Sequence, residues 1–215
     1  MSMIFERRFG LAIAAIAMII FALAALLGGP GATADVGAIQ WLSAARASNS
    51  QLTAAAIAVT SIGGAPGMIV ILLTAIGLLA VRRRWRLALA IGAIVLGGRI
   101  AVELLKLAID RPRPHFGPYP VEVASLSFPS GHAANSMMTF LAIALLAAPA
   151  RFRVMAVTAA VSLSVIIGAT RPLLGVHWPS DVIGGWAFGI AWVTALSFFA
   201  KQQHEVVGGH PPTIA

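Results

Sequence analysis

The sequence predicts an all-α membrane protein built as a bundle of six transmembrane helices, and two observations lead to this. Of the 215 residues, 59% are hydrophobic and only 10% are charged, a balance that a water-soluble chain of this length could not cover with polar surface. The apolar residues also gather into runs of about 20 residues, the length that a helix needs to cross roughly 30 Å of hydrocarbon. Helices are favoured over a barrel because the runs lack alternating polarity.

Six apolar runs are long enough to be spans, and they cover residues 10–29, 56–81, 87–109, 131–150, 154–171 and 181–200. The first run could instead be a signal peptide, since Ala32-Thr33-Ala34 looks like a cleavage site. Its length, however, exceeds the roughly 7–15 residues of a signal-peptide core. We therefore expect a retained helix.

The remaining segments are of two kinds. Residues 35–51 carry apolar side chains at helical spacing beside Trp41, which predicts a short helix lying in the outer interface. Residues 202–215 are polar and contain Gly and Pro. We therefore expect a single membrane domain at 1–201, followed by a flexible cytoplasmic tail at 202–215.

Basic residues dominate the charge, since fifteen Lys and Arg against seven Asp and Glu give a formal net charge of +8. No nucleic-acid partner is expected, because these residues stand mainly between apolar runs. If the chain crosses the membrane at each run, they fall on one side, which the positive-inside rule assigns to the cytoplasm. Both termini are therefore expected inside. The residues are Arg7, Arg8, Arg82, Arg83, Arg84, Arg86, Arg151, Arg153 and Lys201.

The other polar residues gather at the outer ends of the spans, where we expect them to meet in one layer. Cations near two histidines describe a site for an oxyanion, and a tetrahedral phosphate suits their number. Independent anchoring of helix ends would not select two histidines, several cations and a carboxylate on one membrane face. The residues are Lys106, Arg111, Arg113, Ser130, His132, Arg171, His177 and Asp181.

Lys106 and Arg113 stand at the end of the third span. The sequence Arg111-Pro112-Arg113-Pro114 must leave the helix, because a residue that precedes proline is pushed toward extended geometry. The chain can then bend back and bring the Arg113 guanidinium to the same phosphate as the Lys106 ammonium. The alternative for both side chains is snorkelling to lipid headgroups.

Pro129-Ser130-Gly131-His132 precedes the fourth span, so Ser130 is a candidate N-cap and the free amides of the first turn would point outward. A helix N-terminus binds anions, and Gly131 permits close approach of the backbone. His132 can deliver a proton, because the pKa of an unperturbed histidine is about 6.5. The alternative is an ordinary cap with an interfacial histidine.

His177 and Asp181 stand four residues apart at the start of the sixth span. If the turn is helical, the carboxylate can accept the Nδ1 proton of the imidazole, which leaves Nε2 unprotonated as a nucleophile. A buried structural His–Asp pair is the alternative.

Three segments together resemble, in order and spacing, the signature of the type 2 phosphatidic acid phosphatase superfamily. They are Lys106-x6-Arg113-Pro114, Pro129-Ser130-Gly131-His132 and Thr170-Arg171-x5-His177-x3-Asp181. The match spans residues 106–181. Thr170 departs from the family, which usually has serine there.

The resemblance implies a bacterial lipid phosphatase of the inner membrane that forms a phosphohistidine, with its catalytic layer at the outer membrane face, toward the periplasm or exterior. His177 would be the nucleophile, Asp181 its orienting partner, and His132 the acid for the leaving oxygen and then the base on water. No metal ion and no other cofactor are expected. The phosphoryl oxygens would be held by Lys106, Arg113, Ser130, Gly131 and Arg171.

The resemblance leaves the lipid substrate open, and nothing in the sequence indicates an oligomeric state. Undecaprenyl diphosphate leads, because small bacterial members with this look often recycle that carrier, and phosphatidylglycerol phosphate, phosphatidate and lipid A phosphates are the alternatives. Vanadium haloperoxidases share the signature but are soluble. A non-enzymatic transporter would be favoured only if Arg99, Glu103 and Lys106 lined a continuous path.

Some residues outside the signature have simpler interpretations. Arg99 and Glu103 are four residues apart and are expected to pair with each other inside the bundle. His115 is expected in the outer surface loop. Two GxxxG patterns, at Gly63/Gly67 and Gly185/Gly189, are expected to let helix backbones approach closely.

Overall fold

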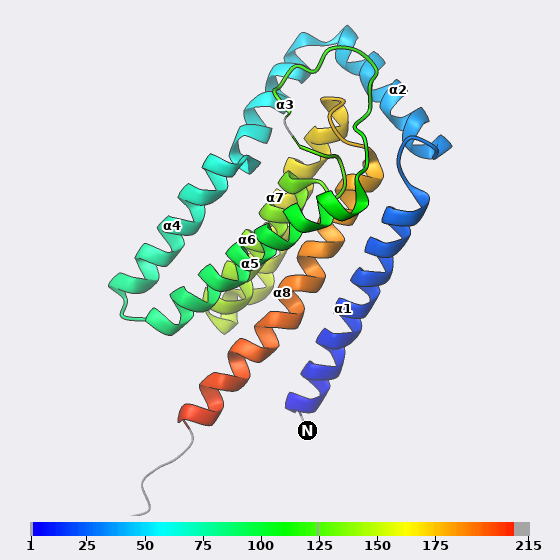
Figure 1. Cartoon of the computed structure of the whole chain (residues 1–215). Coiled ribbons are helices and arrows are strands. Elements are labelled where there is room, and N and C mark those ends of the chain that lie inside the picture. Colours follow the sequence, from blue (N-terminus) through cyan, green and yellow to red (C-terminus); the bar gives the residue numbers. More distant parts are fainter. Residues whose placement is uncertain (1, 124, 209–215) are drawn as a thin grey trace, which may run out of the picture.

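The chain is all helical, as predicted, in the computed structural model, which describes residues 2–123 and 125–208 and the side chains of 8–123 and 125–197. These residues form eight α-helices and one short 3-10 turn, without a strand (Figure 1). The helices are α1 (Ser2–Leu27), α2 (Thr33–Ser48), α3 (Ser50–Gly63), α4 (Ala65–Val81), α5 (Trp85–Ile109), α6 (Gly131–Ala147), α7 (Arg153–Leu173) and α8 (Pro179–Gly208), and the 3-10 turn is Ala150–Phe152.

Several helices have the length and composition of membrane spans. In the described part of the chain, three segments qualify without reservation: Arg8–Leu27, Trp85–Ile109 and Ala150–Leu173. α3 and α4 make a fourth if they are taken together, and α6 is apolar but has only 17 residues. The chain is therefore a multi-pass membrane protein, while the count of six spans stays a prediction.

The second predicted span, residues 56–81, is wrong as a single helix, because α3 and α4 bend by 45° at Gly64. The backbone of Gly64 is extended, with φ −67° and ψ 166°, and Pro66 follows in the first turn of α4. Proline is tolerated there because its missing N–H would have no helical partner. A Cβ on Gly63 would lie 3.3 Å from Cδ2 of His132. The break thus forms a wall beside a predicted catalytic residue.

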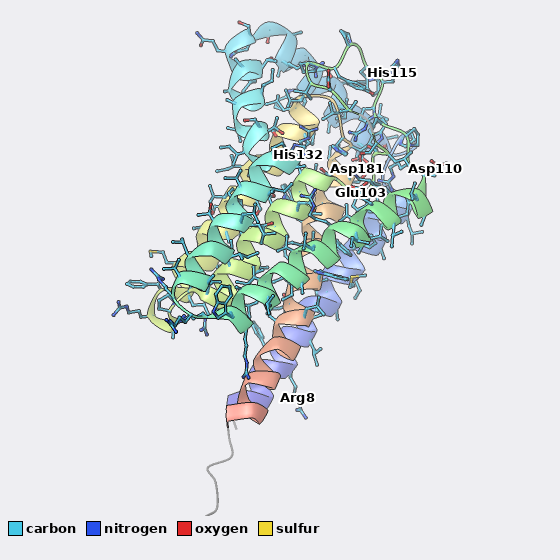
Figure 2. The ribbon with its side chains drawn as sticks, turned by 60° about the vertical axis from the view of Figure 1, so that its left-hand side comes forward. Arg8, Glu103, Asp110, His115, His132 and Asp181 are labelled. Carbon is cyan, nitrogen blue, oxygen red and sulfur yellow. The ribbon has the colours of Figure 1, made fainter. Side chains whose placement is uncertain are left out.

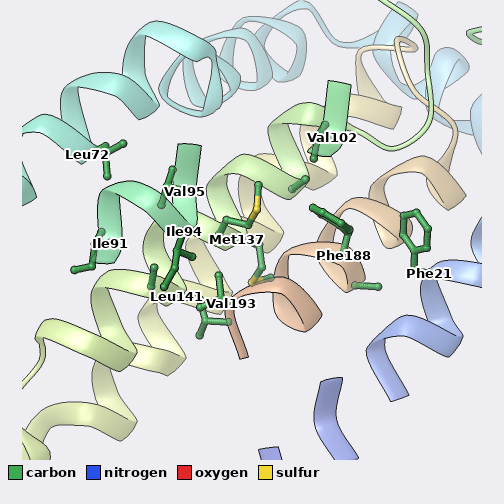
Figure 3. Close-up of a cluster of buried hydrophobic side chains, with 14 of the residues drawn as sticks. Phe21, Leu72, Ile91, Ile94, Val95, Val102, Met137, Leu141, Phe188 and Val193 are labelled. Carbon is green, nitrogen blue, oxygen red and sulfur yellow. The ribbon is translucent and has the colours of Figure 1, made fainter. Parts of the chain in front are cut away.

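The core lies where α5, α6 and α8 meet, and Figure 3 shows Val95, Met137 and Val193 among its side chains. Lipid tails are as apolar as these side chains, so close packing between small residues has to hold the helices together. A Cβ on Gly185 would lie 2.7 Å from the Ser130 carbonyl oxygen, and one on Gly189 would lie 2.8 Å from Cβ of Met137. The second GxxxG pattern is therefore confirmed as a contact between α6 and α8.

The first GxxxG pattern works differently. Gly63 packs against Ile167 of α7, but Gly67 lies against the backbone of Ile62 at the α3–α4 break. Only one of these two glycines therefore faces another long helix.

The two ends of the bundle carry different groups. Figure 1 shows the start of α1 and the arginine-rich turn between α4 and α5 at one end, with α2, the loop segments 110–123 and 125–130, and the start of α8 at the other. Arg8 lies at the first end, and His132 and Asp181 lie at the second (Figure 2). The described arginines that we expect to set topology are thus separated from the polar layer. The side chains of Arg7 and Lys201 lie outside the described part.

Two boundaries differ from those predicted. α2 replaces the interfacial helix expected at 35–51 and ends before Asn49, whose Oδ1 accepts a hydrogen bond from the Leu52 N–H at 2.9 Å and so starts α3. α8 continues to Gly208, past the expected start of the tail. Residues 209–215 lie outside the described residues, and the flexibility of the tail stays a prediction.

Candidate active site

The start of α8 fixes the Asp181 carboxylate by local rules. Pro179 is the first helical residue, a position where its ring geometry suits the helix. Asp181 follows in the first turn and folds back, so that its Oδ2 accepts the Trp178 backbone N–H at 2.9 Å, in the manner of a capping box. The helix dipole also favours a negative charge here.

His177 lies directly before this turn and is fully buried. Its Nδ1 is 3.4 Å from Oδ2 of Asp181, and its Nε2 is 3.1 Å from Nη1 of Arg113. A guanidinium can only donate, so Nε2 is the acceptor nitrogen and the ring proton belongs on Nδ1. Burial, opposed in part by the hydrogen bond to Asp181, lowers the pKa of His177 to about 4. The ring is therefore neutral at pH 7.

The predicted contact between His177 and Asp181 is thus present, but His177 precedes the helix and does not belong to it. Ser127 supports the same arrangement, since its hydroxyl donates to Oδ2 of Asp181 and lies 3.4 Å from Nδ1 of His177. The carboxylate is therefore held from several directions.

Arg113 ties the segment that leaves α5 to the loop before α8. Its Nε donates to the Ser125 carbonyl at 2.7 Å and its Nη1 to the Val176 carbonyl at 2.6 Å. Burial lowers the pKa of Arg113, against the opposing effect of Asp181, but an arginine remains a cation in any protein at pH 7. The bend predicted from the two prolines does bring this cation to His177.

Lys106 is buried near the outer end of α5. Its Nζ donates to Oε1 of Glu103 at 3.1 Å and to Oγ of Ser125 at 3.0 Å. A Cβ on Gly131 would lie 3.5 Å from this Nζ, so the ammonium sits beside the first turn of α6. The expected pair between Arg99 and Glu103 is wrong, because residues three apart also share a helix face and Glu103 pairs with Lys106.

Ser130 is the N-cap residue of α6, as predicted, but its hydroxyl does not cap the helix. Its backbone N–H donates to the Asp181 carbonyl at 2.9 Å, which joins α6 to α8. Its Oγ is buried and has no hydrogen-bond partner among the described residues. The hydroxyl and the first-turn amides of α6 are thus suited to an oxyanion.

Arg171 is buried at the end of α7. Its Nη1 donates to the Thr60 hydroxyl of α3 at 2.7 Å, while its Nε has no partner within the described residues. The neighbouring Thr170, which stands where serine is usual, donates its hydroxyl to the Ile167 carbonyl at 2.6 Å. The threonine hydroxyl is therefore used within its own helix.

The sequence-based interpretation missed several residues that support the site. Arg111 belonged to the predicted outer layer without a role, yet its Nη1 donates to Oδ1 of Asp181 at 2.9 Å. The sequence pattern places Asp35 only within an interfacial helix, and it indicates no role for Ser127 or Thr60. A carboxylate alone in an apolar segment could have drawn attention to Asp35, since such charges usually have a partner.

A cavity of about 610 Å³ adjoins the site between α5 and the following loop. Polar and apolar side chains share its wall, among them Lys106, Arg113, Tyr119, Leu107 and Leu126. In the part of the chain that the structure describes, no cluster of His, Cys, Asp or Glu side chains is placed to hold a metal ion. Metal independence stays a prediction.

Comparisons with known proteins agree with this geometry. The family model described as the PAP2 superfamily matches residues 85–205. Among solved structures, a transmembrane PAP2 type phosphatidylglycerolphosphate phosphatase from Bacillus subtilis superposes with a TM-score of 0.76 at 25% identity, over 88% of this chain and 96% of that one.

Curated relatives match over a smaller part. A lipid A 1-phosphatase of Rhizobium johnstonii is 41% identical over 48% of this chain and 43% of its own length. A phosphatidylglycerophosphatase B of Bacillus subtilis is 33% identical over 51% and 54%. An undecaprenyl-diphosphatase of Sulfolobus acidocaldarius is 38% identical over 33% and 32%. The chain thus spans about half the length of the first two relatives and less of the third.

Proposed function

The chain belongs to the PAP2 superfamily, as the three-part signature predicted, and we propose that it is a membrane lipid phosphatase acting through a phosphohistidine on His177. One observation carries the proposal: the His177 ring has Nδ1 toward Asp181 and Nε2 toward Arg113, at 3.4 and 3.1 Å. The Nε2 lone pair of His177 points toward the Arg113 guanidinium. That guanidinium would hold an oxygen of the phosphoryl group that Nε2 attacks.

In the first half-reaction, Nε2 of His177 attacks phosphorus, and the bond from phosphorus to the lipid oxygen breaks with its electron pair on that oxygen. His132 donates a proton to this oxygen, and the dianionic phosphate beside it favours the protonated ring. The phosphorylated imidazole keeps its proton on Nδ1, and Asp181 stabilises its positive charge.

In the second half-reaction, His132 takes a proton from water as the water oxygen attacks phosphorus. The bond between phosphorus and Nε2 of His177 breaks, phosphate leaves, and both histidines return to their starting protonation. The phosphoryl oxygens are held throughout by Lys106, Arg113, Arg171, the Ser130 hydroxyl and the Gly131 amide.

The substrate we propose is a lipid phosphate, with undecaprenyl diphosphate as the first to test and lipid A 1-phosphate, phosphatidylglycerol phosphate and phosphatidate after it. The names of the three relatives share only a phosphate carried by an amphiphile. The cavity beside the site joins Lys106 and Arg113 to apolar Leu107 and Leu126, which suits a headgroup with its first methylenes. Each CH₂ kept out of water contributes about 0.8 kcal/mol to retaining such a chain in the membrane.

The test is phosphate release by the purified protein from a panel of lipid mono- and diphosphates, ranked by kcat/KM. Long-chain and short-chain versions of one diphosphate are presented at equal mole fraction in mixed micelles, and the long chain should give the higher kcat/KM. Activity should survive EDTA and be inhibited by vanadate, which can adopt the shape of a phosphoryl transition state. Better hydrolysis of glucose 6-phosphate than of every lipid would rule out the lipid assignment.

We further propose that the site faces the periplasm or exterior from the inner membrane, because the arginine-rich turn lies at the opposite end of the bundle. Single variants Arg83→Cys and Tyr119→Cys allow labelling of intact cells with an impermeant thiol reagent. Position 119 should be labelled and position 83 should not. The reverse pattern would place the site in the cytoplasm.

A further inference from the structure

Arg111, which has no role in the mechanism above, binds the oxygen of the Asp181 carboxylate that does not contact His177. Nη1 of Arg111 donates to Oδ1 of Asp181 at 2.9 Å and to Oγ of Ser180 at 3.1 Å. Both ionic partners are almost completely buried. Because Arg111 occupies Oδ1, the carboxylate can turn only its Oδ2 toward His177, so Arg111 selects the orientation of the catalytic pair.

Arg111 is itself fixed by the end of α1. Its Nη2 donates to the carbonyls of Ala24 and Ala25 at 3.0 and 2.6 Å, and its guanidinium lies 4.3 Å from the ring centre of Phe128. The last carbonyls of a helix have no partner of their own and carry the negative end of its dipole, so they attract a cation. Gly29, at φ +102°, lets the chain turn over the arginine, because a Cβ there would lie 3.1 Å from Nε of Arg111.

Asp35 of α2 fixes the first turn of α8, which carries Asp181. Its Oδ1 accepts the Ser180 backbone N–H at 3.0 Å, and its Oδ2 accepts the Ser180 hydroxyl and the Gly29 N–H, the latter at 2.6 Å. A carboxylate at a helix N-terminus satisfies amides that the helix leaves unpaired. Ser180 directly precedes Asp181, so Asp35 holds the turn that carries the catalytic carboxylate.

We infer that Arg111 and Asp35 are positioning residues, through which the end of α1 and the start of α2 hold the Asp181–His177 pair in its reactive orientation. Asp35 lies outside residues 85–205, where the family model matches. The site is therefore completed by a part of the chain that this match does not include. The inference rests on the proposed function, because it concerns the orientation of the proposed nucleophile.

The expected signature is a loss of rate without a loss of binding. The side-chain hydrogen bonds of Arg111 and Asp35 go to Asp181, Ser180, Gly29 and the end of α1, and not to the Ser130 hydroxyl or the Arg171 guanidinium, which would hold the phosphate. Removing either positioning residue should lower kcat and leave KM and the inhibition constant of inorganic phosphate within about threefold. A misplacement of about 1 Å can cost on the order of 10²-fold in rate.

The experiment compares Asp35→Asn with Asp110→Asn, the same substitution at an exposed aspartate that ends α5 in a left-handed conformation. Asparagine tolerates that conformation, so the control should keep wild-type kinetics. We expect Asp35→Asn to lower kcat about tenfold and Arg111→Met about 10²-fold. Arg111→Lys keeps the charge but cannot reach Asp181 and the α1 carbonyls together, so it should fall between wild type and Arg111→Met.

Single-turnover trapping of the phosphoenzyme separates positioning from mere structural damage. A positioning role predicts a full burst amplitude with a reduced rate constant, whereas partial unfolding predicts a reduced amplitude with the wild-type rate constant, which would overturn the inference. If Arg111→Met does not fold, Asp35→Asn and Ser180→Ala carry the same prediction. Wild-type kcat in these variants would refute the inference alone, whereas a wild-type protein inactive on every lipid phosphate would refute the proposed function and the inference with it.

Discussion

The two sides of the proposed phosphate site differ in how their polar atoms are satisfied. On the nucleophile side, the Asp181 carboxylate has four protein partners, which are Arg111, Ser127, His177 and the Trp178 N–H. On the receiving side, Oγ of Ser130 and Nε of Arg171 are buried and have no partner among the described residues. One side is complete without substrate, and the other is not.

This difference fits the proposed roles of the two sides. An unsatisfied buried polar group costs about 1–3 kcal/mol. In the proposed function, oxygens of the bound phosphate would accept hydrogen bonds from Ser130 and Arg171 and remove this cost. The nucleophile side gains instead from being fixed in advance, because preorganised groups need no rearrangement at the moment of reaction.

Substituting Asp181, at the centre of the nucleophile side, should give the largest effect. Asp181→Asn keeps the size of the side chain but replaces an acceptor oxygen with a donor amide, so His177 loses the partner that keeps its proton on Nδ1. We expect kcat to fall by about 10⁴-fold with little change in KM. Initial rates on a lipid diphosphate measure this, with Asp110→Asn as the control. A loss below tenfold would show that Asp181 does not orient the nucleophile.

His132, which lies beside the α3–α4 break, is the proposed acid for the leaving group. Its substitution tests that role. His132→Ala should slow hydrolysis by on the order of 10²–10⁴-fold when the leaving alcohol has a high pKa. The defect should shrink for an ester whose leaving group has a low pKa, since that group needs no proton. The measurement is the dependence of kcat/KM on leaving-group pKa. Equal losses for all esters would remove His132 from the role of acid.

The pH dependence of stability tests how completely His177 is shielded from water in the folded protein. The pKa of His177 is lowered to about 4 in the folded protein, against about 6.5 in an unfolded chain. Between these values the unfolded chain binds the extra proton, so stability falls as pH drops from about 6.5 to 4. This part of the fall should be absent from the thermal midpoints of His177→Ala in detergent.

The same neutral ring is the proposed nucleophile, so kcat/KM of the wild type should fall in acid only as the pH approaches about 4. An acidic limb near pH 6.5 would instead indicate an ordinary histidine pKa. Such a result would mean that His177 is better solvated than its burial implies.

The smallest effect should come from the unsatisfied hydroxyl of Ser130. Ser130→Ala removes a buried group that has no protein partner in the described residues, so the thermal midpoint should stay the same or rise. The inhibition constant of inorganic phosphate should increase by about three- to tenfold, as expected for one lost hydrogen bond. A destabilised protein with unchanged phosphate affinity would reverse the division between the two sides.

The sequence predicted the position of Ser130 and the His177–Asp181 contact better than it predicted the residues that support them. Signature spacing and helix-end rules predict Ser130, His132 and the contact of His177 with Asp181, because these depend on neighbours a few residues away. The bond between Asp35 and Ser180 joins residues 145 positions apart, and no local pattern encodes such a distance.

The break at Gly64 is a different case. The double glycine followed by Pro66 was visible in the sequence, but the apolar run continued across it, and its length favoured a single span. Hydropathy alone cannot distinguish a straight span from a bent one, since both are equally apolar. The pairing of Glu103 was missed for a similar reason, because Arg99 and Lys106 both share its helix face.

The most direct test of the proposed division of roles is to trap the phosphoenzyme with ³²P-labelled substrate carrying a low-pKa leaving group. The wild type should give a transient phosphohistidine that is labile to acid and stable to alkali. His177→Ala should give none, and His132→Ala should accumulate it, because phosphorylation needs no acid with this substrate while hydrolysis still needs His132 as base. Labelling of His177→Ala at the wild-type level, or rapid turnover without accumulation in His132→Ala, would contradict the account.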